Sequence, residues 1–168
     1  MKEIVIRDNL PIEVINHNML HYATKGKYGL AICLGNSFSY FAYDDMLTLM
    51  NVFNQAIVEG GYLLINTAML AESVFPSQES RSWMQAGTLY FLMVHEYDNL
   101  LGALKTDMQF ILNDRVEKKT AYHFIYRLAE LMRMFSNQGF KVEATYGDLD
   151  QKEYDFGDAQ AYILLRKL

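Results

Sequence analysis

The 168-residue sequence has one cysteine, two prolines and no run of basic residues longer than Lys118-Lys119. A single cysteine excludes an internal disulfide framework and fits a reducing compartment, so we expect a cytoplasmic protein. The net charge of −5, without clustered lysine or arginine, argues against nucleic-acid binding. No apolar stretch approaches the roughly 20 residues that a membrane helix needs, and charges interrupt the first residues, unlike a signal peptide. We therefore expect neither a membrane nor a nucleic acid as partner.

Hydrophobic residues make up 51% of the chain, enough for one domain with its own core. Residues 30–34 form an apolar run between two glycines, and residues 62–66 form a second, as expected of strands buried on both faces. Between them, residues 44–57 place apolar side chains at helical spacing, with an aspartate cap at 44 or 45. The glycine pair at 60–61 is expected to end this helix. Strand, helix and strand together predict a βαβ unit.

Shorter elements flank this unit. Residues 1–9 resemble the last turns of a helix, and residues 12–15 form a short apolar segment after a proline that predicts a strand. Near the other end, residues 128–135 carry a helical stripe that Gly139 ends, and residues 140–146 and 160–166 are predicted strands. The acidic loop between these strands, 147–158, lacks the ligand spacing of a calcium loop, so we interpret it as a solvated hairpin loop.

The segment from residue 88 to residue 126 has a different character. Tyr, Phe, Val and Thr are frequent in residues 88–98, 103–112 and 116–126, and turn-forming residues separate the three. This pattern predicts an antiparallel meander inserted between a partial α/β core, 1–87, and a closing part, 127–168. Alternation alone leaves two interpretations open, a lid over a site or a sheet extension that only widens the core.

Five segments in a particular order then carry a family resemblance. They are residues 10–20, 28–41 (with the turn Gly35-Asn36-Ser37), 60–66, 139–148 and 161–167. Together they resemble the later part of the class I S-adenosylmethionine-dependent methyltransferases, most closely the small-molecule members with a β-rich insert after the fifth strand. The resemblance implies a Rossmann-like α/β fold that lacks its first strands, S-adenosylmethionine as cofactor without a metal, and a small N or O acceptor.

The same resemblance implies site residues. Those at positions that contact the cofactor in the family are Asn18, Met19, Leu34, Gly35 and Asn36. Those placed to contact the acceptor are Ser37, Phe38, Tyr40, Glu72 and Arg81. Local turn chemistry, aromatic packing and surface ion pairs are the structural alternatives for these residues.

Four residues of the meander, His95, Tyr97, His123 and Tyr126, are weak catalytic candidates, because a histidine on a lid can accept a proton from the acceptor. Each one alone is more often structural. Cys33, inside an apolar strand, is expected to be an inert buried thiol. His17 and His21 have a metal-binding spacing only on a helix, and no further ligand completes a set, so we expect no metal.

The glycine-rich turn that holds the cofactor in the family has no counterpart, because fewer than ten residues precede Leu10. Three interpretations remain open: a fragment, a truncated gene product, or a non-catalytic remnant acting as a dimer or partner subunit. In the family's strand order, the absent strands lie between the strands at residues 12 and 30. We therefore expect these two edges to pair directly or to recruit another chain, as a homodimer or with a missing N-terminal part.

Overall fold

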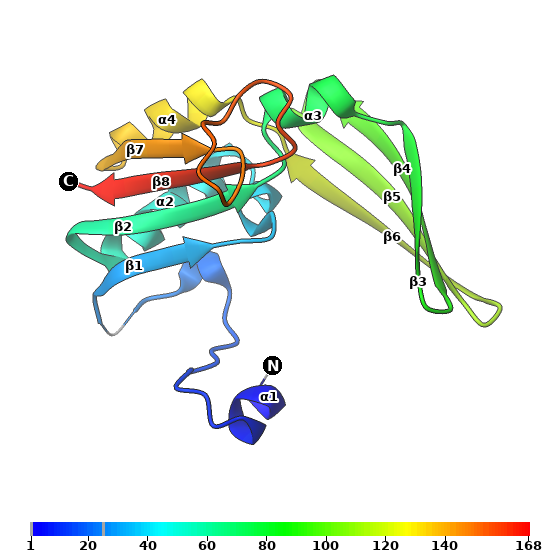
Figure 1. Cartoon of the computed structure of the whole chain (residues 1–168), viewed down its shortest axis with the longest axis horizontal. Coiled ribbons are helices and arrows are strands. Elements are labelled where there is room, and N and C mark those ends of the chain that lie inside the picture. The colour runs from blue at the N-terminus through cyan, green and yellow to red at the C-terminus, as the bar shows by residue number, and fades with distance from the viewer. Residues whose placement is uncertain (1, 25) are drawn as a thin grey trace.

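Two four-stranded sheets joined by short connections make up the molecule (Figure 1). The structure is a computed structural model and describes residues 2–24 and 26–168. The first sheet has the order β1-β2-β8-β7, with β1 at Tyr28–Cys33, β2 at Ile57–Thr67, β8 at Ala161–Lys167 and β7 at Phe140–Tyr146. β1 and β2 run parallel, whereas β8 runs antiparallel to both of its neighbours. The mixed sheet with its helices confirms the methyltransferase-like α/β fold that the sequence predicts.

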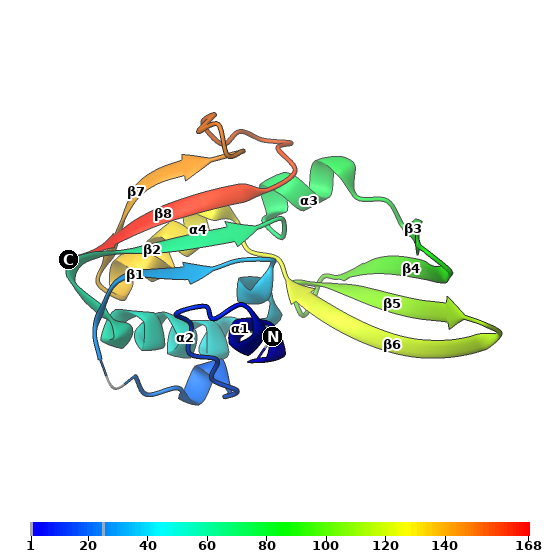
Figure 2. The same ribbon diagram turned by 60° about the horizontal axis from the view of Figure 1, so that its bottom comes forward.

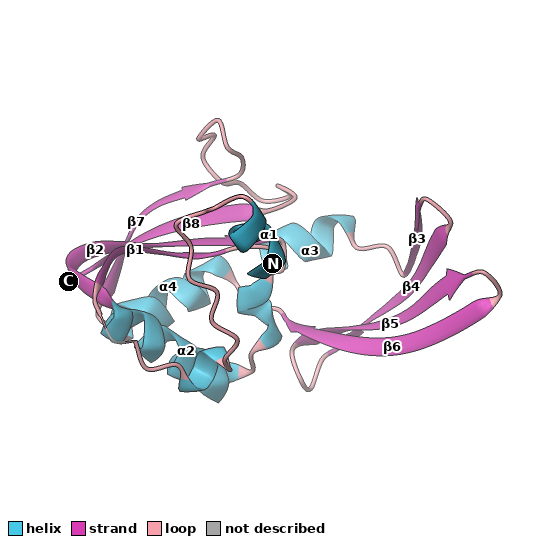
Figure 3. Cartoon of the chain, turned by 90° about the horizontal axis from the view of Figure 1, so that it is seen from below, coloured by secondary structure: helices cyan, strands magenta, loops and turns pink. Residues whose placement is uncertain are grey.

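Both long helices cover the same face of this sheet, α2 at Tyr43–Ala56 and α4 at Leu128–Asn137 (Figure 3). The core lies between them and the strands, where Leu49 of α2 and Phe135 of α4 are fully buried. Cys33 is buried in this core, and burial raises the pKa of its thiol to about 11. Among the described residues, no helix is both long and apolar enough to cross a membrane.

The second sheet contains the predicted meander, and Figure 2 shows it extending away from the first. Its strands pair antiparallel in chain order: β3 at Arg81–Ala86, β4 at Leu89–Asp98, β5 at Ala103–Leu112 and β6 at Arg115–Phe124. The last three confirm the prediction, and β3 is a fourth strand that it missed. The exposed polar residues before Arg81 hid this strand, because β3 is defined by its pairing with β4 rather than by an apolar run of its own.

The N-terminal segment corrects one prediction. α1 spans Lys2–Arg7 and projects from the core with none of its residues buried (Figure 1). Residues 12–15, predicted to be a strand, pair with no other described residue, so that prediction is wrong. Ile12 and Ile15 are exposed. The segment also does not pair directly with β1, so one of the two outcomes expected for these two edges is not found. A strand requires a partner for its N–H and C=O groups, and no described strand pairs with this segment.

The boundary between α2 and β2 corrects another prediction. The helix ends at Ala56 rather than at the glycine pair, which lies inside β2. The register between β1 and β2 shifts between Tyr28 and Leu30, so the glycines occupy an irregular part of the ladder. A Cβ on Gly61 would lie 2.9 Å from the carbonyl oxygen of Gly29, so only glycine allows this approach of the two strands.

The remaining helices are short. α3 spans Ala71–Ser77 between β2 and β3, and the 3₁₀ helices η1 and η2 span Met19–His21 and Ser37–Tyr40. A bridge between Leu70 and Tyr126 joins the chain just before α3 to the chain just after β6. This bridge links the two chain segments that connect the second sheet to the first.

Candidate functional site

The end of β1 forms a sharp turn beside the end of β2. Gly35 and Asn36 both have left-handed backbone conformations, with φ of 66° and 62°. The Asn36 side-chain oxygen accepts a 2.6 Å hydrogen bond from the backbone N–H of Ala68, just beyond β2. The Ser37 hydroxyl donates to the carbonyl oxygen of Leu34 at 2.9 Å. These bonds hold the carboxyl ends of two parallel strands together, the place where open α/β sheets bind ligands. We call residues 34–36 the lip.

The 3₁₀ helix η2 connects the lip to the second sheet. Its Tyr40 is 53% exposed and its ring lies 4.6 Å from the ring of His123 on β6. Phe38, predicted to contact the acceptor, is instead buried, with its ring stacked 5.6 Å from that of Phe135. Phe38 is therefore a core residue, because aromatic burial against α4 leaves its ring no free face toward a ligand.

The face of the second sheet that meets η2 and α3, here the inner face, is the more buried one. Residues of β4 alternate strictly, with Met93, His95 and Tyr97 partly buried and Leu92, Val94 and Glu96 exposed. Register places the following side chains on the inner face: Ser82, Phe91, Met93, His95, Tyr97, Leu104, Thr106, Met108, Phe110, Ala121 and His123. The same register places Met84, Glu117 and Lys119 on this face, so its outer part carries an ion pair beside the aromatic rings.

A row of hydrogen bonds crosses this face through His95. Its Nε2 lies 3.0 Å from the Ser82 hydroxyl, and its Nδ1 lies 3.0 Å from the Thr106 hydroxyl. Both ring nitrogens are therefore engaged. Sequence reasoning named His95 but missed Ser82 and Thr106. The signal for Thr106 was present, because a turn at residues 99–102 places 106 opposite 95 in the hairpin.

His123 is the less satisfied histidine. Among the described residues, its Nδ1 is buried and has no hydrogen-bond partner. Burial lowers the pKa of His123, and the nearby His95 lowers it further. The ring is thus held neutral at neutral pH, the form that can accept a proton.

The other two catalytic candidates have structural contacts. The Tyr97 ring packs edge-on against Phe75 of α3 at 5.0 Å. The Tyr126 hydroxyl donates to the carbonyl oxygen of Phe41 at 3.1 Å. Burial raises the pKa of Tyr126 to about 12, with Glu130 and Tyr43 adding to the effect. A phenol that binds this proton so tightly is a poor base near neutral pH.

Glu72 and Arg81, both predicted to contact the acceptor, lie neither at the lip nor on the inner face. The Glu72 carboxylate accepts hydrogen bonds of 3.1 and 3.3 Å from the backbone N–H of Leu128, so it caps the beginning of α4. Arg81 pairs with Val94, on the exposed face of the second sheet, opposite to His95. Their predicted role with the acceptor has no support from these positions.

Asn18 and Met19 lie at the 3₁₀ helix η1. The Asn18 side chain accepts a 2.9 Å hydrogen bond from the N–H of Leu20 and caps η1. Met19 lines an open, mostly apolar pocket of about 410 Å³ with Leu30 and Phe53, and residues 34–36 are not among its lining. Among the described residues, Met19 and the lip therefore do not line one common pocket.

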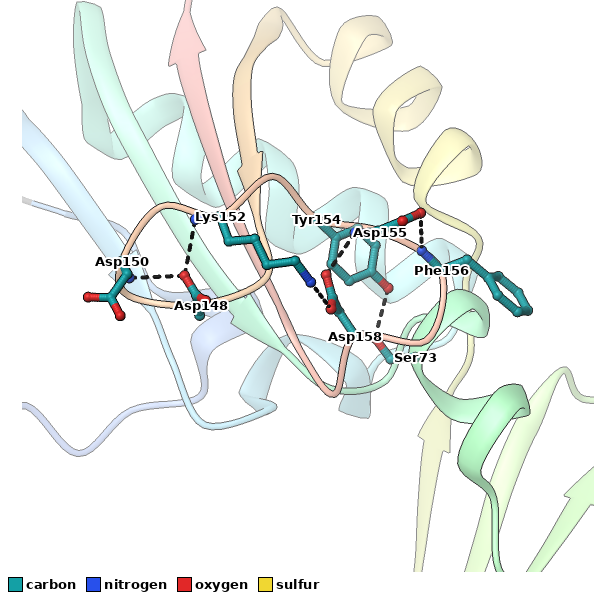
Figure 4. A network of polar contacts seen from close by, with 8 residues as sticks. All are labelled: Ser73, Asp148, Asp150, Lys152, Tyr154, Asp155, Phe156 and Asp158. Atoms are coloured by element: carbon teal, nitrogen blue, oxygen red, sulfur yellow. Dashed lines mark hydrogen bonds and ion pairs between the residues drawn. The ribbon is translucent and has the colours of Figure 1, made fainter.

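Hydrogen bonds from its own side chains, together with one contact to α3, stabilise the acidic loop 147–158 (Figure 4). The Asp148 carboxylate accepts from the N–H groups of residues 150 and 152, and Asp158 accepts from Lys152 Nζ at 2.6 Å. Tyr154 lies 2.7 Å from the Ser73 hydroxyl and ties the loop to α3. These contacts confirm a hairpin loop between β7 and β8.

Comparison with known structures identifies the fold. No family model matches the sequence, and no curated protein matches it. A S-adenosylmethionine-dependent methyltransferase from Clostridium acetobutylicum aligns with 99% of this chain and 69% of its own, with a TM-score of 0.87 and 9% identity. The amino pentose methyltransferase CalS10 from Micromonospora echinaspora aligns with 99% of this chain and 70% of its own, with a TM-score of 0.72 and 10% identity. The sugar N-methyltransferase KedS8 from a Streptoalloteichus species aligns with 98% of this chain and 66% of its own, with a TM-score of 0.71 and 10% identity.

The chain thus has the fold of class I S-adenosylmethionine-dependent methyltransferases, and it spans about two thirds of the length of these neighbours. The lip leaves its backbone open to a ligand. An added Cβ on Gly35 would meet nothing within 4 Å, so a ligand can approach the backbone there, and Leu34 beside it is exposed. Among the described residues, no glycine-rich turn after a strand complements it.

Proposed function

We propose that this chain is the acceptor-binding part of a S-adenosylmethionine-dependent methyltransferase that methylates an amine or hydroxyl of a small molecule, with an amine preferred. The observation that carries the proposal is the continuity from the lip through Tyr40 to His123. Tyr40, which follows the lip in the chain, has its ring 4.6 Å from the ring of His123, whose pKa burial lowers. The sugar and amino pentose methyltransferases with the same fold support an amine as acceptor.

The cofactor, when bound, supplies a methyl group that a sulfonium centre already activates. The residues proposed to hold it are Asn18, Met19, Leu34, Gly35 and Asn36, of which the last three form the lip. Asn36 acts through the backbone, since its side chain is committed to Ala68. The protein's task is mainly to position the two reactants, which explains why no strong acid–base pair lies at the lip.

The acceptor is proposed to lie against the inner face, between Tyr40 and His123, with Ser37 at its lip side. An ammonium acceptor must lose a proton before its nitrogen can attack. His123 can take this proton at a ring nitrogen because the fold holds the ring neutral. The row Ser82–His95–Thr106 fixes the neighbouring ring and keeps this part of the face rigid.

Methyl transfer from labelled S-adenosylmethionine to a panel of amino sugars and simple amines tests this function. We expect transfer to at least one amine and a decrease in kcat of about 10²-fold for His123→Asn, the low end of general-base effects. Tyr122→Phe, on the opposite and exposed face of β6, is the control and should be unchanged. Transfer that is equally fast in His123→Asn would contradict the proposed base.

A second candidate is a non-catalytic partner subunit built on the same fold. The lining of the Met19 pocket favours it, because this pocket does not include residues 34–36. Absence of cofactor binding would support this candidate.

A further inference from the structure

The inner face of the second sheet continues far beyond His123. From the lip outward, the rows that β4 and β5 contribute pair Tyr97 with Leu104, His95 with Thr106, Met93 with Met108, and Phe91 with Phe110. His123 of β6 lies in the first of these rows, opposite Leu104. Successive rows on one face are two residues, or about 7 Å, apart, so about 20 Å separate His123 from Phe110. A ligand that begins at His123 therefore has room to extend well beyond the size of a single sugar.

The row of His95 is less polar than its residue types suggest. Both nitrogens of the His95 ring are engaged at 3.0 Å by the hydroxyls of Ser82 and Thr106, and Thr106 is itself buried. An apolar group can cover this ring without leaving a ring nitrogen unpaired. The row therefore places no polar barrier between His123 and the outer part of the face.

The rows beyond His95 form an apolar surface. We call its residues the strip: Met84, Phe91, Met93, Met108 and Phe110. Met84 is 54% exposed, and the other four are only partly buried. In Figures 2 and 3, no helix lies against the outer half of this sheet. Methionine and aromatic side chains together adapt to apolar ligands of varied shape.

A cavity opens at the outer end of the strip. Its volume is about 660 Å³, within the range of small-molecule sites. Its lining includes Leu89, Phe110 and Leu112, which the register places on the inner face. Lys119 forms a 2.9 Å ion pair with Glu117, and its Nζ lies 5.8 Å from the centre of the Phe110 ring. The cavity thus has an apolar wall with a charged border along β6.

The position of the methyl donor sets the direction of the acceptor. In the proposed function the donor lies at the lip, and the reacting amine lies between the donor and His123. The rest of the acceptor must extend away from the lip, where the inner face offers the strip. An apolar body placed there removes apolar surface of both ligand and protein from water.

We propose that the acceptor is an amphiphilic amine, with its amino group at His123 and an apolar or aromatic body along the strip, ending in the cavity at Phe110. The inference rests on the proposed function and adds a substrate class to it. A free amino sugar reaches only the first rows, so it is a weaker ligand than an amine with an apolar body. A second copy of this chain stacked on the strip is the competing occupant, because exposed apolar faces also mark protein interfaces.

Binding of linear primary amines, from butylamine to decylamine, tests this substrate class by calorimetry and by NMR of the chain labelled at its methionine methyl groups. We expect the dissociation constant to fall about fourfold for each added CH₂. The methyl signals of Met93 and Met108 should shift, whereas those of Met46 and Met50 in the buried core should not. Glucosamine, which has an amine but no apolar body, should shift neither pair.

A matched pair of variants on β5 completes the test. Phe110→Ala should weaken the binding of decylamine about tenfold, because it removes the ring at the end of the strip. Ile111→Ala, the next residue on the opposite face of the same strand, should leave this binding unchanged. The methionine shifts of the unchanged chain decide the question even if Phe110→Ala does not fold.

The outcomes separate this inference from the proposed function. A dissociation constant independent of chain length, or amine binding that shifts neither Met93 nor Met108, overturns the inference. So does a dimer in solution whose Met93 and Met108 signals shift on dilution to the monomer, because a second copy then covers the strip. Methyl transfer to glucosamine as fast as to decylamine keeps the proposed function and overturns the inference. Binding of decylamine along the strip without methyl transfer to any amine contradicts the proposed function and keeps the strip as a site for amphiphilic amines.

Discussion

At the scale of single residues, the two histidines of the second sheet differ in their hydrogen bonding, and this difference indicates a functional role for one of them. His95 uses both ring nitrogens, whereas His123 has a buried nitrogen without a partner beside an exposed tyrosine ring. A buried polar atom without a partner costs free energy, so its retention next to a strand-end lip favours a role with a ligand. Alternation in the sequence placed both histidines on a sheet but could not distinguish them, because the distinction depends on Ser82 and Thr106 across the strands.

Stability should depend on pH through His123. The fold lowers the pKa of His123 below its ordinary value of about 6.5, so the unfolded chain binds the proton more readily than the native state. Its contribution is therefore complete above pH 6.5 and is lost as the pH falls toward the folded pKa. Urea unfolding at pH 7.5 and pH 5 should show a smaller acid loss for His123→Phe than for the wild type. His21→Phe is the control. An equal loss of unfolding free energy at pH 5 in the wild type and in His123→Phe would contradict this pH dependence.

Gly61 has a steric role that can be measured. An alanine there would place its Cβ 2.7 Å from Ile57 Cγ2 and 2.9 Å from the Gly29 oxygen. We expect Gly61→Ala to lower the free energy of unfolding by about 1–3 kcal/mol, as overpacking does. Gly29→Ala is the matched control, since its Cβ would meet nothing within 4 Å. Equal midpoints of chemical unfolding for the two variants would show that the strands can separate without cost.

At the scale of elements, patterns within a segment were predictable and pairings were not. The helix at residues 128–137 and the strands β4 to β8 follow from apolar spacing and turn residues alone. Residues 12–15 have the same apolar character, yet they form no strand because no partner lies beside them. β3 is the converse, a segment without a continuous or alternating apolar run that becomes a strand because β4 offers an edge. Pairing depends on residues far away in the sequence, which periodicity does not report.

The contact between Glu72 and α4 makes an element-scale prediction. Its carboxylate accepts from Leu128 N and places a negative charge at the positive end of the helix. Glu72→Gln should cost about 0.3–1 kcal/mol, and Glu72→Ala should cost more, up to about 2 kcal/mol, because it also removes the acceptor. Thermal unfolding monitored by circular dichroism measures both. Glu79→Gln on an exposed connection is the control, and a loss as large in that variant would refute the capping role.

At the scale of the whole molecule, the two sheets divide the proposed work. The first supplies the lip, and the second supplies the inner face that meets it through Tyr40 and His123. The link between them is short and specific, with the Leu70–Tyr126 bridge and the hydrogen bond from Tyr126 to Phe41. The order of segments along the chain was sufficient to predict this fold.

Loss of the Tyr126 hydroxyl should loosen this link between the sheets. Tyr126→Phe keeps the buried ring and removes the bond to the Phe41 carbonyl, so we expect a loss of about 1 kcal/mol in unfolding free energy. Hydrogen exchange of residues 124–126 should also become faster. Tyr122→Phe, on the exposed face of β6, should change neither. Unchanged exchange in Tyr126→Phe would mean that the bridge alone holds the sheets.

Calorimetric titration with S-adenosylhomocysteine tests the central claim most directly. We predict saturable binding with a Kd on the order of 1 µM, equivalent to about −8 kcal/mol. Asn36→Gly, which keeps the left-handed turn but removes the bond to Ala68, should bind more weakly. No detectable heat from a folded preparation would contradict a methyltransferase and leave the non-catalytic subunit as the function of this fold.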